Sequence, residues 1–195
     1  LTFALHHYLV EQLKLNVQIV GLDLKEDVVA FCNEMATRLG FDHLNFYAED
    51  IRDFRTEGQV DLVVSLHACD VATDYALAQA VKWGAQVILA VPCCQHEVFG
   101  QLEQGRDSVL LEHGVLKERT AALLTDAARA KLLESEGYLV RVMEFIDLEH
   151  TPKNLLIRAF LDSQVKMEQA WDQYVQFAAT WGIKPMLESL IAKEG

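Results

Sequence analysis

The sequence has little positive charge for its size, and this limits what the protein can bind. Its 195 residues include 17 Lys and Arg against 29 Asp and Glu, so the formal net charge is -12. Proteins that bind nucleic acid without regard to sequence draw their affinity from basic groups placed at phosphates. The charge balance argues against that class, although an enzyme that touches RNA locally stays open.

Long hydrophobic runs are also absent. The longest, such as residues 87–91, fall far short of the ~20 residues that a membrane-spanning helix requires. The first ten residues hold His6 and His7 and lack the basic leader of a signal peptide. With 51% hydrophobic and 24% charged residues, the composition is that of a globular protein. The sequence therefore predicts a cytoplasmic protein without a membrane segment.

Cysteine is scarce, and its spacing is irregular. The four cysteines are Cys32, Cys69, Cys93 and Cys94, which do not form the pattern of a disulfide framework. His67 and His96 lie near three of them, so zinc has to be considered. The spacing is not that of a zinc finger, and adjacent cysteines rarely bind one ion together. Buried thiols are the favoured interpretation, and no metal is predicted.

Strand and helix patterns alternate through the first half of the chain. Such alternation predicts βαβ units and a parallel sheet. The predicted strands are residues 17–22, 44–48, 60–66 and 86–91, and the predicted helices are residues 27–39 and 72–83. The chain also begins within an apolar pattern of helical spacing, so we expect a segment to precede Leu1.

The second half has a different organisation. Residues 97–118 are expected to form a long connection, and residues 119–136 a helix. Strands are predicted over residues 138–146 and 155–161, with too few residues between them for a parallel crossover, so they should pair antiparallel. A last amphipathic helix is predicted over residues 164–181.

Polar residues follow the predicted strands, at the sheet edge where open α/β folds bind ligands. Asp23 ends a strand where a carboxylate can accept hydrogen bonds from both hydroxyls of a ribose. Its alternative role is to cap the following helix. Asp50 can accept from an adenine amino group while Ile51 covers the ring, although a simple loop acid is the more common explanation.

These strand ends resemble those of class I S-adenosylmethionine (SAM)-dependent methyltransferases. The stretch from Leu66 to Asp74 (LHACDVATD) and the stretch from Pro92 to His96 (PCCQH) are the more specific features. They are similar to a family that includes methyltransferase-like proteins and glutathione S-transferase C-terminal-domain-containing proteins. A more distant similarity is to tRNA 2′-O-methyltransferases.

The resemblance implies an α/β, Rossmann-like sheet of seven strands, mostly parallel, with a C-terminal antiparallel hairpin. Its first strand and glycine-rich loop would lie just before the helix that opens this chain. Residues 1–162 would form the methyltransferase domain and residues 163–195 its helical extension. SAM would be the cofactor, with cofactor-binding residues Asp23, Leu24, Asp50, Ile51, Leu66, His67 and Ala68. The acceptor pocket would hold Cys69, Pro92, Cys93, Cys94, His96, Lys153 and Asn154.

Methyl transfer from a sulfonium needs mainly a precise placement of donor and acceptor. A base is required only where the acceptor must lose a proton, and His67 or Asp70 is the candidate for that role. The acceptor itself, whether RNA, protein or a small molecule, is not predicted. Two alternatives remain: an NAD-dependent oxidoreductase, which would continue with parallel strands, and a non-catalytic binding protein with the same fold.

Overall fold

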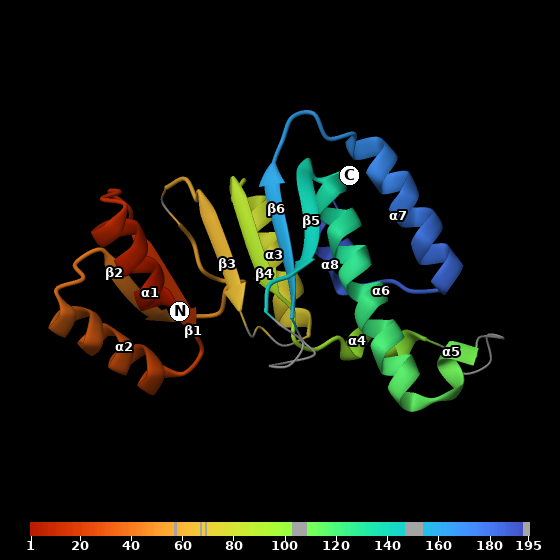
Figure 1. Ribbon diagram of the computed structural model, residues 1–195, viewed down its shortest axis with the longest axis horizontal. Helices are drawn as coiled ribbons and strands as arrows, with labels where there is room; N and C mark the ends of the chain where they lie inside the picture. The colour runs from red at the N-terminus through yellow and green to blue at the C-terminus, as the bar shows by residue number, and fades with distance from the viewer. Residues whose placement is uncertain (57, 67, 69, 103–108, 147–153, 193–195) are drawn as a thin grey trace. The chain divides into compact units, whose positions relative to one another are not determined.

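A computed structural model describes residues 1–56, 58–66, 68, 70–102, 109–146 and 154–192 of the chain. The chain forms two compact units, Leu1–Arg55 (unit 1) and Thr56–Gly195 (unit 2), which are shown as ribbons in Figure 1. Among the described residues, no helix is both long and apolar enough to cross a membrane.

Unit 1 is built on a parallel pair of strands. Its elements are α1 (Thr2–His6), a π-helix η1 (His7–Gln12), β1 (Ile19–Asp23), α2 (Glu26–Leu39) and β2 (Leu44–Ala48). β1 and β2 pair in parallel with Gly21 opposite Phe46. The helix α2 ends at Gly40, whose φ of 69° places it in the left-handed conformation that favours glycine at a helix end. This confirms the parallel pairing predicted from the alternation of strand and helix.

Two polar side chains, one half-buried and one buried, take part in the packing of unit 1. The Asn33 side chain on α2 donates to the Phe46 carbonyl and accepts from the Phe46 amide, both at 2.9 Å, so it fixes α2 against β2. His6 is 2% exposed and its ring stacks on that of Phe41 with the centroids 4.0 Å apart. The histidine therefore has a packing role in this unit.

Unit 2 contains a mixed four-stranded sheet with the order β3–β4–β6–β5 (Figure 1). Its strands are β3 (Leu62–Leu66), β4 (Val87–Val91), β5 (Tyr138–Glu144) and β6 (Leu155–Leu161). β3 and β4 are parallel, whereas β6 lies antiparallel between β4 and β5. This arrangement confirms the predicted Rossmann-like class with a C-terminal antiparallel hairpin. The described residues hold six strands in two sheets, where the resemblance implies a single sheet of seven.

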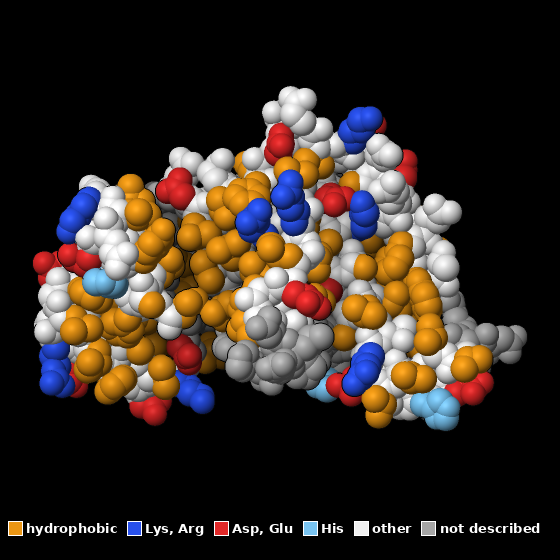
Figure 2. Space-filling model, in the orientation of Figure 1, with side chains coloured by type: hydrophobic (Ala, Val, Ile, Leu, Met, Phe, Trp, Pro, Cys, Tyr) orange, Lys and Arg blue, Asp and Glu red, His pale blue; other side chains and the backbone are white. Residues whose placement is uncertain are grey.

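Unit 2 also contains helices, several of which contribute buried residues to the main core. They are α3 (Val71–Lys82), α4 (His96–Gln101), α5 (Val109–Glu112), α6 (Gly114–Ser135), α7 (Met167–Trp181) and α8 (Met186–Ile191). Every second residue of β3 and β4 is buried against them, including Ile88 and Ala90, both 0% exposed. The intervening residues are mostly half-buried, and Figure 2 shows hydrophobic side chains over these strands.

The segment predicted as a long connection, residues 97–118, is instead largely helical where it is described. It contains α4, α5 and the first turn of α6, which begins at Gly114 rather than near residue 119. Gly100 and Gly114 lie in helices with nothing within 4 Å of the position of a β-carbon. The glycines indicated breaks, but the helices form because Val98, Leu102 and Leu111 are buried in a second apolar cluster.

Candidate functional site

Asp23 lies at the carboxyl end of β1, as predicted, and its carboxylate is exposed. One oxygen, Oδ1, accepts from the Lys25 amide at 2.9 Å, and the helix cap itself is Lys25. The other oxygen has no hydrogen-bond partner among the described residues. The next residue, Leu24, is 70% exposed. A free carboxylate oxygen beside an exposed apolar side chain suits the hydroxyls and the apolar face of a nucleoside.

Asp50 follows β2, and its carboxylate already has hydrogen-bond donors. Its carboxylate accepts from Arg52 Nε at 3.0 Å, from Arg52 Nη2 at 2.7 Å and from the Arg52 amide at 2.9 Å. These hydrogen bonds hold the pKa of the Asp50 carboxyl below its ordinary value. Ile51 beside it is half-buried. Both Asp50 oxygens therefore have a partner, and contact with an adenine amino group would use their remaining lone pairs.

In unit 2, Asp70 follows β3 and has an unusual backbone conformation. Asp70 has φ 51° and ψ -122°, a region that non-glycine residues enter at a cost of about 1–3 kcal/mol. Ala68 and Asp70 are both half-buried. The Ala68 carbonyl accepts from the Thr73 hydroxyl at 2.6 Å. Such strain persists only where the surrounding contacts enforce it, so the hydrogen-bond partners of Asp70 must hold it in this conformation.

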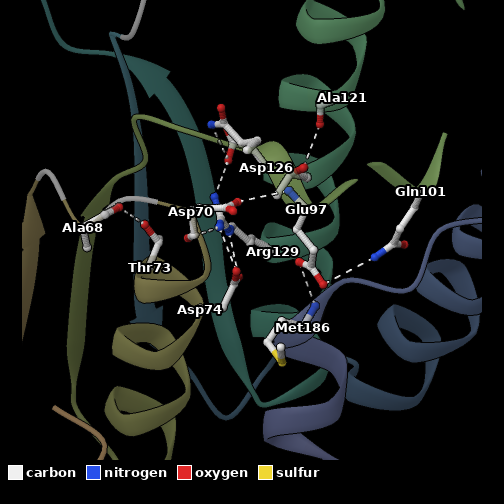
Figure 3. A network of polar contacts seen from close by, with 12 residues as sticks. Ala68, Asp70, Thr73, Asp74, Glu97, Gln101, Ala121, Asp126, Arg129 and Met186 are labelled. Carbon is white, nitrogen blue, oxygen red and sulfur yellow. Dashed lines mark hydrogen bonds and ion pairs between the residues drawn. The ribbon is translucent and has the colours of Figure 1, made fainter. Parts of the chain in front are cut away.

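Asp70 joins the two motifs singled out in the sequence. Its Oδ1 accepts from the Glu97 amide in the first turn of α4 at 3.2 Å, so a residue after β3 caps the helix after β4 (Figure 3). The second oxygen has no hydrogen-bond partner among the described residues. The Cys93 sulfur lies 4.0 Å from the Ala68 carbonyl oxygen. Pro92 is buried, Cys93 and Cys94 are half-buried, and His96 is exposed.

Asp70 is hydrogen-bonded to a buried ion-pair network (Figure 3). Arg129 on α6 is 0% exposed and donates to both oxygens of Asp74 on α3, at 2.8 and 2.9 Å. It also donates to Asp126 at 3.1 Å and to the Asp70 carbonyl at 3.0 Å. Gln95 Nε2 donates to Asp126 at 3.2 Å. One guanidinium thus connects α3, α6 and the segment after β3, and Asp126 connects them to the segment after β4.

The network holds more negative than positive charge. Burial raises the pKa of Asp126 despite the opposing effect of Arg129. Burial also raises the pKa of Glu97, and the nearby carboxylates of Asp74 and Asp70 add to that effect. Burial by itself lowers the pKa of Arg129, but the hydrogen bonds and charge of Asp74 and Asp126 raise it above its ordinary value. The guanidinium of Arg129 is therefore charged. Without it, the buried carboxylates would have no opposite charge beside them.

Three of the predicted site residues, His67, Cys69 and Lys153, lie outside the described residues. Among the rest of the chain, no group of three or more His, Cys, Asp or Glu side chains is placed to hold a metal ion. Asn154 is 2% exposed, and its side chain donates to the Ile146 carbonyl at 2.9 Å. This hydrogen bond joins the two ends of the β5–β6 connection, so Asn154 has a structural role. A contact between Asn154 and a substrate stays a prediction.

Sequence reasoning gave no role to Asp74, Gln95, Asp126 or Arg129, although Asp74 and Gln95 lie in the two stretches that carry the resemblance. The signal was present in α6, where Asp126 and Arg129 are three residues apart on the helix face that also buries Leu132 and Leu133. Charged residues on an apolar face need partners, since an unpaired buried charge is very costly. The sequence does not show which residue pairs with Arg129, because Asp74 lies 55 positions away.

Comparison with known proteins identifies the family. A family model described as a methyltransferase domain matches residues 1–101, and the chain belongs to this methyltransferase family. Glutathione S-transferase C-terminal domain-containing proteins from Homo sapiens and Macaca fascicularis are each 26% identical over 165 residues. The match covers 72% of this chain and 26% of each relative, so the chain spans about a quarter of their length.

Two solved structures show a limited similarity. The N-methyltransferase NodS from Bradyrhizobium japonicum aligns with a TM-score of 0.41 and 15% identity, covering 75% of this chain and 74% of NodS. The CMeT domain of the citrinin polyketide synthase aligns with a TM-score of 0.42 and 17% identity, covering 79% of this chain and 41% of that one. The methyltransferase assignment therefore rests on the family match.

Proposed function

We propose that this methyltransferase chain uses SAM as its methyl donor, and that Asp23 binds the ribose of the cofactor. The observation that carries the proposal is the exposed Asp23 carboxylate with one oxygen free, followed by the exposed side chain of Leu24. Carboxylates only accept hydrogen bonds, so a single Asp can hold two adjacent hydroxyls. In unit 1 these two residues fit the adenosine part of SAM, with Ile51 as an additional apolar contact.

In unit 2, the residues after β3 and β4 are proposed to serve the reacting end. Leu66 and Ala68 would contact the methionine part of the cofactor, and Pro92, Cys93, Cys94 and His96 the acceptor. SAM, when bound, supplies a methyl group on a positively charged sulfur. The chain's own residues place the acceptor, and the free oxygen of Asp70 could take a proton from a hydroxyl or amine. The acceptor is unidentified, and cytoplasm is the expected compartment.

The alternative of an NAD-dependent oxidoreductase is less well supported. A dinucleotide-binding domain would usually continue with parallel strands, whereas β6 is antiparallel to both of its neighbours. A non-catalytic protein with a methyltransferase fold is the second alternative. Calorimetry with the reaction product addresses both, because it measures cofactor binding without the acceptor.

The test is titration of S-adenosylhomocysteine into the full-length protein. We expect binding in the micromolar range for the wild type, weakened at least about tenfold in Asp23→Ala, because two charge-assisted hydrogen bonds are lost. Asp42→Ala is the matched control. Asp42 is an exposed acid of unit 1 without a side-chain hydrogen bond among the described residues, so this variant should bind normally.

Two results would contradict the proposal. If the folded wild type does not bind S-adenosylhomocysteine, SAM dependence fails, and NADH is the next ligand to test. If the wild type and Asp23→Ala bind equally well, SAM binding stands but the ribose role of Asp23 does not.

A further inference from the structure

We propose that Arg129 and Thr73 are positioning residues that set the place of Ala68 and Asp70, and thereby the binding of the amino-acid part of the cofactor. Arg129 lies outside both sequence motifs, and Thr73, although it lies in the stretch from Leu66 to Asp74, was not among the predicted site residues. This inference rests on the proposed use of SAM, and it concerns residues of unit 2 alone.

Hydrogen bonds from Arg129 and Thr73 reach the backbone of Asp70 and Ala68. Arg129 Nη2 donates to the Asp70 carbonyl at 3.0 Å, and the same guanidinium donates hydrogen bonds to both Asp74 oxygens. The Thr73 hydroxyl donates to the Ala68 carbonyl at 2.6 Å, and the Thr73 amide donates to the Asp70 carbonyl at 3.1 Å. The backbone after β3 is therefore held at two carbonyls by side chains that are 0% and 1% exposed.

The backbone of Asp70 is strained. A residue with φ 51° and ψ -122° returns to a relaxed conformation unless its neighbours prevent it. Its carbonyl is held by Arg129 and its carboxylate by the Glu97 amide. Strained residues of this kind cluster at binding and catalytic sites, where the strain keeps one geometry in place. These contacts hold Asp70 in that geometry before any ligand binds.

Arginine suits position 129 better than lysine does. Its planar guanidinium donates along several directions at once, and here Nε, Nη1 and Nη2 reach Asp74, Asp126 and Asp70. A lysine ammonium is a compact group and does not span three partners. Two buried carboxylates require only a positive charge, so the additional hydrogen bond to the Asp70 carbonyl is what ties the ion pair to the candidate site.

The experiment compares two ligands on the full-length protein by calorimetry. S-adenosylhomocysteine and 5′-methylthioadenosine share the adenosine and the sulfur, but only the first carries the amino-acid part. We expect Arg129→Lys to weaken S-adenosylhomocysteine roughly tenfold, since small displacements at a site reduce binding and rate strongly. Binding of 5′-methylthioadenosine should stay within about twofold, because the positioned segment does not contact that ligand.

Thr73→Val is the milder variant, and it leaves every charge paired. It removes only the hydrogen bond to Ala68 and should weaken S-adenosylhomocysteine several-fold, again without affecting 5′-methylthioadenosine. Thr125→Val is the matched control. Thr125 is 1% exposed like Thr73, but its hydroxyl bonds to Ala121 within its own helix. This control should bind both ligands as the wild type does.

Each outcome decides a different question. The inference is overturned if a folded Arg129→Lys or Thr73→Val protein binds S-adenosylhomocysteine normally. It is also overturned if both ligands weaken equally, which is the result of a merely structural ion pair. If Arg129→Lys does not fold, the binding of the two ligands to Thr73→Val tests the inference by itself. If the wild type binds neither ligand, SAM dependence itself is wrong, and the inference falls with it.

Discussion

Asp70 combines a strained backbone with a side chain that caps a neighbouring helix. Its φ of 51° would suit glycine, whereas its carboxylate accepts from the Glu97 amide at 3.2 Å. An aspartate at this position therefore has a strained backbone, which is destabilising, and a side chain that forms a stabilising hydrogen bond to the segment after β4. The two contributions can be separated by substitution.

We predict that Asp70→Gly is more stable than Asp70→Ala by about 1 kcal/mol. Both variants lose the cap, but only alanine keeps the strain. Urea unfolding followed by circular dichroism measures the difference. As a control, Ala127→Gly on the exposed face of α6 should show the ordinary order, with glycine the less stable residue. Equal or greater stability of Asp70→Ala would mean that the backbone at this position is not strained.

At the scale of the elements, the pairing of β1 with β2 depends on a close approach. Gly21 lies opposite Phe46, and a β-carbon at Gly21 would come within 2.3 Å of the Phe46 ring. The ring is also stacked on Phe3 of α1, with the centroids 5.6 Å apart. A glycine inside a predicted strand is explained here by the space that an aromatic ring on the adjacent strand requires.

We predict that Gly21→Ala destabilises the protein by about 1–3 kcal/mol, because the ring must move. Phe46→Leu in the same chain should recover part of the loss, and this non-additivity is the measurable sign of the contact. Gly100→Ala is the control, since nothing lies within 4 Å of its β-carbon position. If the effects of Gly21→Ala and Phe46→Leu simply add, the proposed contact does not limit the packing.

The elements also show how far sequence patterns extend. Apolar strands and glycine helix ends located β3, β4, α2 and α3 closely. The short interval before β6 indicated its antiparallel pairing with β5, because a parallel crossover needs more chain. The helices α4 and α5 were missed, since their burial depends on the cluster around Val98 and Leu111 and not on a regular local pattern.

For the whole molecule, the two units differ in how much apolar surface they bury. In unit 1 the buried apolar residues are Val29, Ala36 and Leu44, which are between 3% and 8% exposed. In unit 2 one core cluster alone includes Leu77, Ile88, Leu132, Ile157 and Leu187, each 0% exposed. Because hydrophobic burial is the main favourable contribution to folding, the larger core should be the more stable one.

We therefore predict unequal protection in hydrogen exchange. Amides of β4 and β6 should exchange at least about tenfold more slowly than those of β1 and β2, in line with a difference of more than 1.4 kcal/mol in opening free energy. Mass spectrometry of peptides from the native protein measures this directly. Equal exchange in all four strands would show that the units open together.

The sequence by itself determined the α/β class, the antiparallel hairpin and the position of the strand-end residues, because periodicity and connection length are local properties. Asp23 was located in this way. The tertiary structure alone decided what those residues meet. It placed Asn154 in the hairpin and brought Arg129 to Asp74 across 55 positions. Partners far apart in the chain are chosen by packing, and a buried charge shows only that a partner is required.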